Sequence, residues 1–262
     1  MASLYRENLG SGPDLVLVHG WGMHSGVWRE VAHRLARSFR VTLLDLPGHG
    51  NSSSIGAFSL NEVSLAVIEN APPIAHWVGW SLGATIVMNI AALRPQGVAS
   101  VVTLGGNAKF VRGTDWPAGM DSSLLWEFSR ELSRDKSRTL RRFAGLQVNR
   151  GDSGRVLLRQ LMSLQNECEI PAVSVLKGGL EILRTADLRH SLSALQIPGL
   201  LLFGEKDVLV PDAAGVAMAR LWQGATVQVV AGGTHVLFLS HPKLFEAAVT
   251  EFIFNGLQAH DG

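Results

Sequence analysis

The chain has 262 residues, of which 47% are hydrophobic, and this is enough for one large α/β domain with its own core. The net charge of +1 gives no reason to expect a nucleic acid as a partner, and Cys168, the single cysteine, excludes an intrachain disulfide. Because no secretory signal begins the chain and no apolar run approaches the ~18 residues of a membrane span, we expect a cytoplasmic protein without membrane association.

Short β-rich runs alternate with helical patterns in the first part of the chain. The pattern predicts strands at 15–19, 41–45, 75–79 and 98–104 and helices at 27–36, 60–69 and 82–93. Such alternation is typical of a mostly parallel sheet with helices on both faces. It stops near 110, and the pattern stays mostly helical to 185. We therefore predict an α/β core of residues 1–109 and 186–262 with a helical cap inserted at 110–185.

The strand pattern resumes in the last part of the chain. It predicts strands at 200–203 and 227–230 and helices at 212–222 and 242–254. These elements complete the predicted sheet. Side chains that follow its strands are the ones to search for chemistry, because pockets in open α/β folds form at the carboxyl ends of the strands.

A G-x-S-x-G motif, Gly79 to Gly83, lies between a predicted strand and a predicted helix. In that context the serine occupies a tight, strained turn, and the two glycines avoid a clash while the hydroxyl is presented above the sheet. Ser81 is therefore the predicted nucleophile. A serine hydroxyl is a poor nucleophile until a base takes its proton, and the expected chain order is serine, acid, histidine.

His235 and Asp207 are the predicted base and acid. His235 follows the last predicted strand directly, whereas three other histidines are less well placed, namely His190, His241 and His260. Asp207 follows the strand at 200–203 and would hold His235 in the right tautomer. Glu205 is the rival acid, but we expect it to be solvated. Asp212 is expected to cap the next helix.

The oxyanion that forms during acyl transfer needs fixed hydrogen-bond donors. The backbone N–H of Leu82, at a helix N-terminus, is one candidate. The backbone N–H of Trp21 is the second, because the glycines in His19-Gly20-Trp21-Gly22 let the chain approach a substrate. We interpret His19 as structural in this loop, and we give Asp45 and His49 the same interpretation.

The sequence predicts neither a metal nor a cofactor. The histidines lack the H-x-x-x-H and H-E-x-x-H spacings, and one cysteine is too few for a thiolate site. No G-x-G-x-x-G follows the first predicted strand, which argues against a dinucleotide.

Several segments together resemble a known family. They are H-G-W-G at 19–22, D-L-P-G-H-G at 45–50, G-W-S-L-G at 79–83, G-G-L-E-I-L at 178–183 and S-H-P at 240–242. They resemble the BioH-type esterases of biotin synthesis in the α/β-hydrolase superfamily, and the resemblance covers essentially the whole chain. It implies the α/β-hydrolase fold and hydrolysis of the methyl ester of pimeloyl attached to acyl carrier protein.

The resemblance also implies residue roles. The family's serine, aspartate and histidine fall on Ser81, Asp207 and His235, and its substrate contacts fall on the loop residues Trp21 and Leu82 and on the cap segment 143–147. The predicted substrate-binding residues are therefore Trp21, Trp80, Leu82, Phe143, Ala144, Gly145, Leu146, Gln147 and His235.

Basic residues gather in the predicted cap. Residues 128–160 contain nine basic and three acidic residues. The pairs Arg138 and Arg142, and Arg155 and Arg159, have the spacing that places side chains on one helical face. Since acyl carrier proteins are strongly acidic, we expect these four arginines to dock the carrier. The alternative is an ordinary solvated face of amphipathic helices.

Two other functions stay open. A general short-chain carboxylesterase would turn over free and carrier-bound esters equally. A non-catalytic, ligand-binding relative would share the fold without the chemistry. A dehalogenase is disfavoured, because that chemistry needs a carboxylate where Ser81 stands. We expect the protein to be a monomer.

Overall fold

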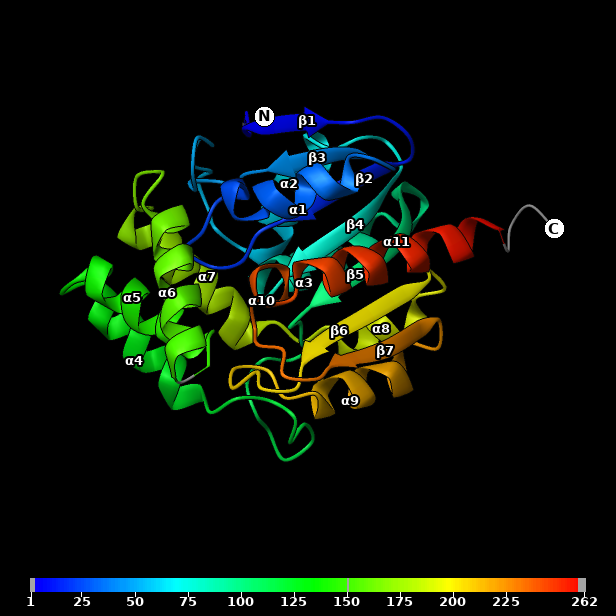
Figure 1. The fold of residues 1–262 in the computed structure, drawn as a ribbon. Helices are drawn as coiled ribbons and strands as arrows, with labels where there is room; N and C mark the ends of the chain where they lie inside the picture. The colour runs from blue at the N-terminus through cyan, green and yellow to red at the C-terminus, as the bar shows by residue number, and fades with distance from the viewer. Residues whose placement is uncertain (1–2, 150, 259–262) are drawn as a thin grey trace.

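The computed structural model describes residues 3–149 and 151–258, which form one seven-stranded sheet (Figure 1). The strand order is β1-β3-β2-β4-β5-β6-β7, and every neighbouring pair is parallel except β1 with β3. The strands are β1 (Arg6–Leu9), β2 (Asp14–Val18), β3 (Arg40–Leu44), β4 (Ala75–Trp80), β5 (Val98–Leu104), β6 (Gly199–Gly204) and β7 (Ala225–Val230). This confirms the predicted mostly parallel α/β fold.

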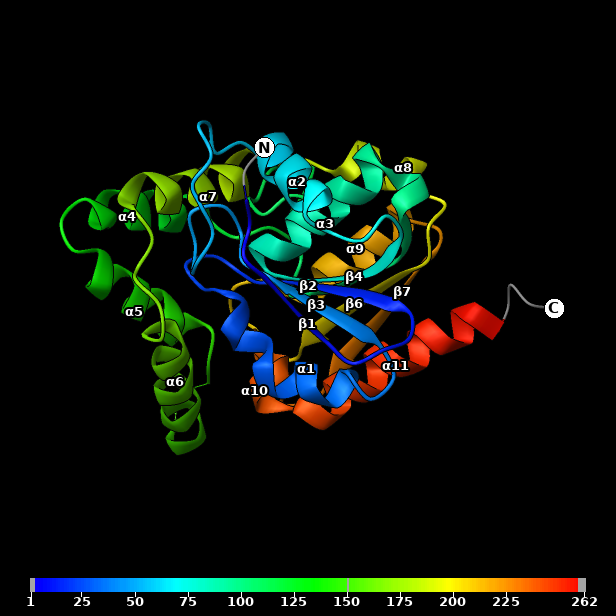
Figure 2. The ribbon, with the colours of Figure 1, turned by 90° about the horizontal axis from the view of Figure 1, so that it is seen from above.

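Helices cover both faces of the sheet (Figure 2). One face carries α1 (Arg29–Leu35), α10 (Leu237–Ser240) and α11 (Pro242–Gln258), and the other carries α2 (Leu60–Glu69), α3 (Leu82–Leu93), α8 (Arg189–Ala194) and α9 (Ala213–Leu221). Each layer buries its own apolar cluster against the strands. Strands buried on both faces explain the continuous apolar runs in the sequence.

A helical segment lies between β5 and β6. It contains α4 (Ser122–Leu132), α5 (Lys136–Leu146), α6 (Asp152–Gln165) and α7 (Val173–Thr185), which sit beside the sheet at the carboxyl ends of its parallel strands (Figure 1). The described part of 105–198 adds no strand to the sheet and has only two isolated bridges, 111 with 120 and 113 with 116. Helix α8, by contrast, packs on α3 and α9. The division at 110 and 185 stays a prediction.

Two features differ from the sequence-based expectation. Strand β1 was not predicted, because it is a short edge strand whose side chains alternate between exposed and half-buried. The predicted helix at 27–36 is shorter, because Ser25–Trp28 forms a 3₁₀ turn that His24 caps, and α1 begins only at Arg29. Along the described chain, no helix is both long and apolar enough to cross a membrane.

Candidate active site

Ser81 occupies a strained turn between β4 and α3. Its φ of 56° and ψ of −115° make it the only described non-glycine residue with positive φ. A Cβ at Gly79 would overlap the carbonyl oxygen of Gly83, and one at Gly83 would overlap that of Val18. The glycines of the motif are thus required by backbone contacts. The turn is further fixed by the Ser81 N–H, which donates to the Leu104 carbonyl at 2.9 Å.

His235 and Asp207 form a buried pair. Asp207 Oδ2 lies 2.6 Å from His235 Nδ1, and the two side chains are 0% and 1% exposed. Asp207 Oδ1 accepts the backbone N–H groups of Leu209 and Val210 at 2.8 and 3.0 Å. A carboxylate that only accepts orients Nδ1–H toward itself and leaves Nε2 with a lone pair. That Nε2 is buried and has no hydrogen-bond partner among the described residues.

The loop after β5 brings the serine and the histidine into one neighbourhood. Leu104 accepts the Ser81 N–H, and the next residue, Gly105, lies against His235. A Cβ at Gly105 would be 2.7 Å from His235 Nδ1 and 3.2 Å from Asp207 Oδ2, and the φ of Gly105 is +54°. Glycine is therefore needed at 105 both for its backbone conformation and for the close approach of the imidazole.

Trp80 connects the serine motif to the backbone of His235. Its indole N–H donates to the His235 carbonyl at 2.9 Å, and the ring packs edge-on against Trp28 and Phe238. The side chain is 1% exposed. Trp80 thus holds the backbone of the histidine from the core, and its contact with substrate stays a prediction.

The two predicted oxyanion donors have suitable backbone positions. Leu82 is the first residue of α3, and Trp21 lies in the loop after β2. Neither backbone N–H donates to an acceptor among the described residues. A free N–H at a helix N-terminus favours negative charge. The assignment of these donors stays a prediction that this geometry supports.

The loop after β2 is tied to the helical segment by three hydrogen bonds that end on carbonyl oxygens. The Trp21 indole N–H donates to Leu176 at 2.8 Å, and the His24 Nε2–H donates to Leu164 at 2.7 Å. In the other direction, the Gln165 amide donates to Gly22 at 3.0 Å. Helix α7 also approaches closely, since a Cβ at Gly179 would be 2.6 Å from Trp21 Cδ1. The helices therefore cover the predicted oxyanion loop.

The predicted cap contacts at 143–147 are only partly inside the protein. The Phe143 ring lies edge-on to Trp21 with centroids 4.8 Å apart. Phe143, Ala144 and Gln147 are buried, whereas Gly145 is exposed. The buried Gln147 Oε1 has no hydrogen-bond partner among the described residues. Phe143 thus packs on the predicted oxyanion loop, and the contact of this segment with substrate stays a prediction.

The rival acids lie elsewhere. Glu205 is exposed and accepts the Gly232 N–H at 2.7 Å. Asp212 occupies the N-cap position of α9, as expected. Its side chain, however, makes no capping hydrogen bond. Among the described residues, no three His, Cys, Asp or Glu side chains are grouped as a metal site requires.

His19 has the structural contacts that were predicted, whereas His49 donates from Nδ1 to the Pro47 carbonyl at 3.0 Å and its buried Nε2 has no hydrogen-bond partner among the described residues. His19 Nδ1–H donates to the Gly20 carbonyl at 2.9 Å, and its Nε2 accepts the Leu46 N–H at 3.0 Å. Asp45 accepts the backbone N–H groups of Ser25 and Asn51. Burial lowers the pKa of His19 to about 3 and that of His49 to about 4. Both imidazoles are therefore neutral in the folded protein at neutral pH.

Because of these two histidines, we expect the stability of the fold to fall at acidic pH. Their pKa values are lower when folded than the 6.5 of the unfolded chain, so the unfolded state binds more protons as pH falls below 6.5. The free energy of unfolding should fall from pH 6.5 to about 4, and His49→Asn should remove on the order of 2 to 3 kcal/mol of that loss. Urea unfolding at pH 7 and pH 4.5 measures this. The exposed His33→Asn is the control, and an equal effect there would contradict the assignment.

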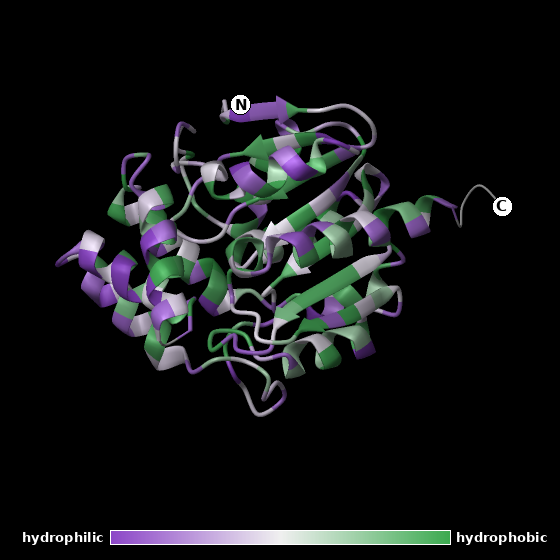
Figure 3. Cartoon of the chain, viewed as in Figure 1, coloured by the Kyte–Doolittle hydropathy of each residue, from purple (hydrophilic) through white to green (hydrophobic). Residues whose placement is uncertain are grey.

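The arginines of the basic segment are not equivalent. Arg142 binds Glu127 and Glu131 at 2.8 and 2.7 Å and lies over the Phe128 ring. Arg155 pairs with Asp152 at 2.9 Å. Neither Arg138 nor Arg159 makes an ion pair with a described residue. Figure 3 shows hydrophilic and hydrophobic residues interleaved along these helices. Two carboxylates balance the charge of Arg142, and the docking role of the four arginines stays a prediction.

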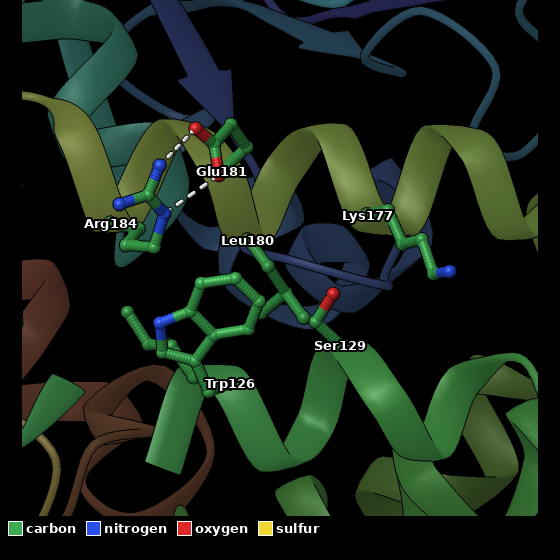
Figure 4. A pocket seen from close by; sticks show the side chains of 7 residues that line it. Trp126, Ser129, Lys177, Leu180, Glu181 and Arg184 are labelled. Atoms are coloured by element: carbon green, nitrogen blue, oxygen red, sulfur yellow. Dashed lines mark hydrogen bonds and ion pairs between the residues drawn. The ribbon is translucent and has the colours of Figure 1, made fainter. Parts of the chain in front are cut away.

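A small pocket opens between α4 and α7 (Figure 4). Trp126 and Ser129 border it from α4, and Lys177 and Arg184 border it from α7. Arg184 pairs with Glu181 and lies over the Trp126 ring. The pocket has a volume of only about 30 Å³. The helical period places these α7 residues away from Gly179, which faces Trp21, so this pocket is separate from the serine.

Comparisons with known proteins agree with this geometry. A family model for the alpha/beta hydrolase fold matches residues 13–242. A pimeloyl-[acyl-carrier protein] methyl ester esterase of Serratia marcescens is 41% identical over 97% of this chain and 99% of its own length. One from Yersinia enterocolitica is 39% identical over 96% of this chain and 98% of its own length.

Solved structures are similar as well. A hydrolase from Pseudomonas aeruginosa aligns with a TM-score of 0.82 and 26% identity over 96% of this chain and 94% of that one. An esterase from Exiguobacterium antarcticum aligns with a TM-score of 0.86 and 19% identity over 96% of both chains. The second likeness concerns the fold alone.

Proposed function

The chain belongs to the pimeloyl-[acyl-carrier protein] methyl ester esterases of the α/β hydrolases, and we propose that it cleaves this ester with Ser81 as nucleophile, His235 as base and Asp207 as the orienting acid. It is a carboxylic ester hydrolase of biotin biosynthesis. All of the proposed catalytic groups come from one chain, so the proposed chemistry does not require a second copy.

The buried His235–Asp207 pair carries the proposal. The His235 Nε2 has a lone pair and no hydrogen-bond partner among the described residues, and the imidazole lies against Gly105, next to the residue that accepts the Ser81 N–H. A buried nitrogen without a hydrogen bond needs an explanation, and for His235, which Asp207 orients, proton transfer from Ser81 supplies one. A serine in a conformation that costs backbone energy supports the same conclusion.

The reaction then follows in two halves. Ser81 Oγ attacks the methyl ester carbonyl while His235 Nε2 takes its proton. The backbone N–H groups of Trp21 and Leu82 stabilise the oxyanion. His235 returns the proton to the departing methoxy group, and methanol leaves. Water, activated by His235, then cleaves the acyl-enzyme and releases the free pimeloyl carboxylate on its carrier.

Paired kinetics test the assignment. The methyl ester of pimeloyl-acyl carrier protein and a free methyl ester of the same acyl chain are given to the purified protein, and methanol is measured. We expect a higher kcat/KM for the carrier-bound ester, mainly through a lower KM. Equal turnover of both would favour a general short-chain carboxylesterase. Cleavage of the free ester alone would refute the carrier substrate.

We propose that the unpaired arginines of the helical segment dock the acidic carrier. Arg138 and Arg159 have free charges, whereas Arg142 is held by two glutamates and Arg155 by an aspartate. Each Arg138→Ala and Arg159→Ala change should raise KM for the carrier substrate about threefold at low salt, because rim charges act on encounter and are screened by ions. Kinetics with the free ester should stay unchanged.

The matched control is Arg220→Ala, which removes an exposed arginine of α9 outside this segment. It should leave both substrates unaffected. Docking through this segment would be disproved if Arg220→Ala raised KM as much as Arg138→Ala. It would also be disproved if the variant that combines Arg138→Ala with Arg159→Ala kept the wild-type dependence of KM on salt.

A further inference from the structure

We propose that a cavity at the amino ends of the central strands binds a compact, neutral phenol or alcohol. The cavity has a volume of about 190 Å³. Its walls are apolar and come from Ala99 of β5, Pro198 just before β6, and Phe252, Ile253 and Leu257 of α11. A dry cavity of roughly 150 Å³ is enough to hold a benzene ring. The space therefore suits a molecule with one ring.

One polar pair faces this apolar space. His76 and Ser100 line the cavity, and His76 Nδ1 lies 2.8 Å from Ser100 Oγ. The His76 Nε2 makes no hydrogen bond with a described residue, and it is not completely enclosed by protein atoms. The residue is 7% exposed and lines the cavity, so its free nitrogen belongs to a largely buried side chain at the cavity wall. Such a group favours a ligand that bonds to it.

A hydroxyl is the group that fits. Either His76 Nδ1–H donates to Ser100, which leaves Nε2 as an acceptor, or Ser100 donates to Nδ1, which leaves Nε2–H as a donor. A hydroxyl donates and accepts, so it satisfies both tautomers. Burial also lowers the pKa of His76, so the imidazole is neutral near pH 7 and a carboxylate gains no ion pair.

The position of the cavity separates it from the esterase chemistry. His76 is the second residue of β4, whereas Ser81 follows the last residue of the same strand. The cavity and the serine therefore lie at opposite ends of one strand. A ligand here does not compete with the ester, and its binding is measurable without any turnover.

The experiment titrates phenol into the ¹⁵N-labelled full chain and follows amide NMR shifts. We expect saturable shifts in 75–77, 98–100 and 252–257. Toluene has the same number of heavy atoms and lacks the hydroxyl, and it should bind about three- to tenfold more weakly. Equal affinities for phenol and toluene, or no saturable shifts in these segments, would overturn the proposal.

Gly256 offers a variant that fills the cavity. It lines the cavity on α11, and a Cβ built there meets no atom within 4 Å, so Gly256→Leu should fold and occlude the space. Phenol should then bind at least tenfold more weakly. Gly56→Leu, at another open and exposed glycine, is the control and should bind phenol like the wild type. Binding that survives Gly256→Leu, or that is lost in Ser81→Ala, would place phenol elsewhere and overturn the proposal.

Discussion

Replacing Ser81 with alanine should lower kcat for the carrier-bound methyl ester by about 10⁴- to 10⁶-fold, because no other group replaces the nucleophile in an acyl-enzyme mechanism. A fluorophosphonate probe should label the wild type and leave Ser81→Ala unlabelled. Labelling or ester cleavage that persists in the variant would contradict the assignment. A wild type that is never labelled would favour a non-catalytic, ligand-binding relative.

The backbone of this turn provides a control for folding. Alanine at 81 keeps a side chain at a φ of 56°, so Ser81→Ala should unfold at nearly the same urea concentration as the wild type. Ser81→Gly relieves the strain and should raise the free energy of unfolding by about 1 kcal/mol while being equally inactive. Loss of activity with unchanged or raised stability separates the missing hydroxyl from a damaged fold.

Asp207→Asn should lower kcat by roughly 10³- to 10⁴-fold with little change in KM. The reason lies in the hydrogen bonds of the carboxylate. Oδ1 accepts two backbone N–H groups, from Leu209 and Val210, and an asparagine oxygen would keep those bonds. The amide nitrogen would then face His235 Nδ1 and donate to it. That places the proton of the imidazole on Nε2, which cannot then act as a base.

The control for this change is the rival acid. Glu205→Gln should alter kcat less than twofold, because Glu205 is exposed and bonds only to the Gly232 N–H. Steady-state kinetics on one ester substrate compare the two variants. If Glu205→Gln were the more damaging change, or if Asp207→Asn kept a tenth of wild-type kcat, the acid would be misassigned.

Local patterns in the sequence predicted what depends on near neighbours. The glycine spacing around Ser81 is set by backbone contacts within the turn and with β2, and it could be predicted from the motif alone. The order of strands predicted that residues after β6 and β7 would meet, and Asp207 and His235 are indeed paired. Their catalytic roles stay predictions that kinetics will test.

Long-range contacts could not be predicted in the same way. The bond from Trp80 to the His235 carbonyl joins residues 155 positions apart, and nothing in the motif distinguishes a ring facing the core from one facing a ligand. Arg142 is neutralised by Glu127 and Glu131 on the neighbouring helix, so a charge count over one segment overstated its free positive charge. The cavity beside His76 arises where α11 passes the amino ends of the central strands.

The three bonds between the loop after β2 and the helical segment have an evolutionary consequence. Each ends on a main-chain oxygen, at Gly22, Leu164 or Leu176, and any amino acid supplies such an oxygen. Selection therefore acts unequally on the two sides of each contact. Trp21, His24 and Gln165 should stay fixed in lineages that retain this arrangement, while 164 and 176 are free to exchange one apolar residue for another.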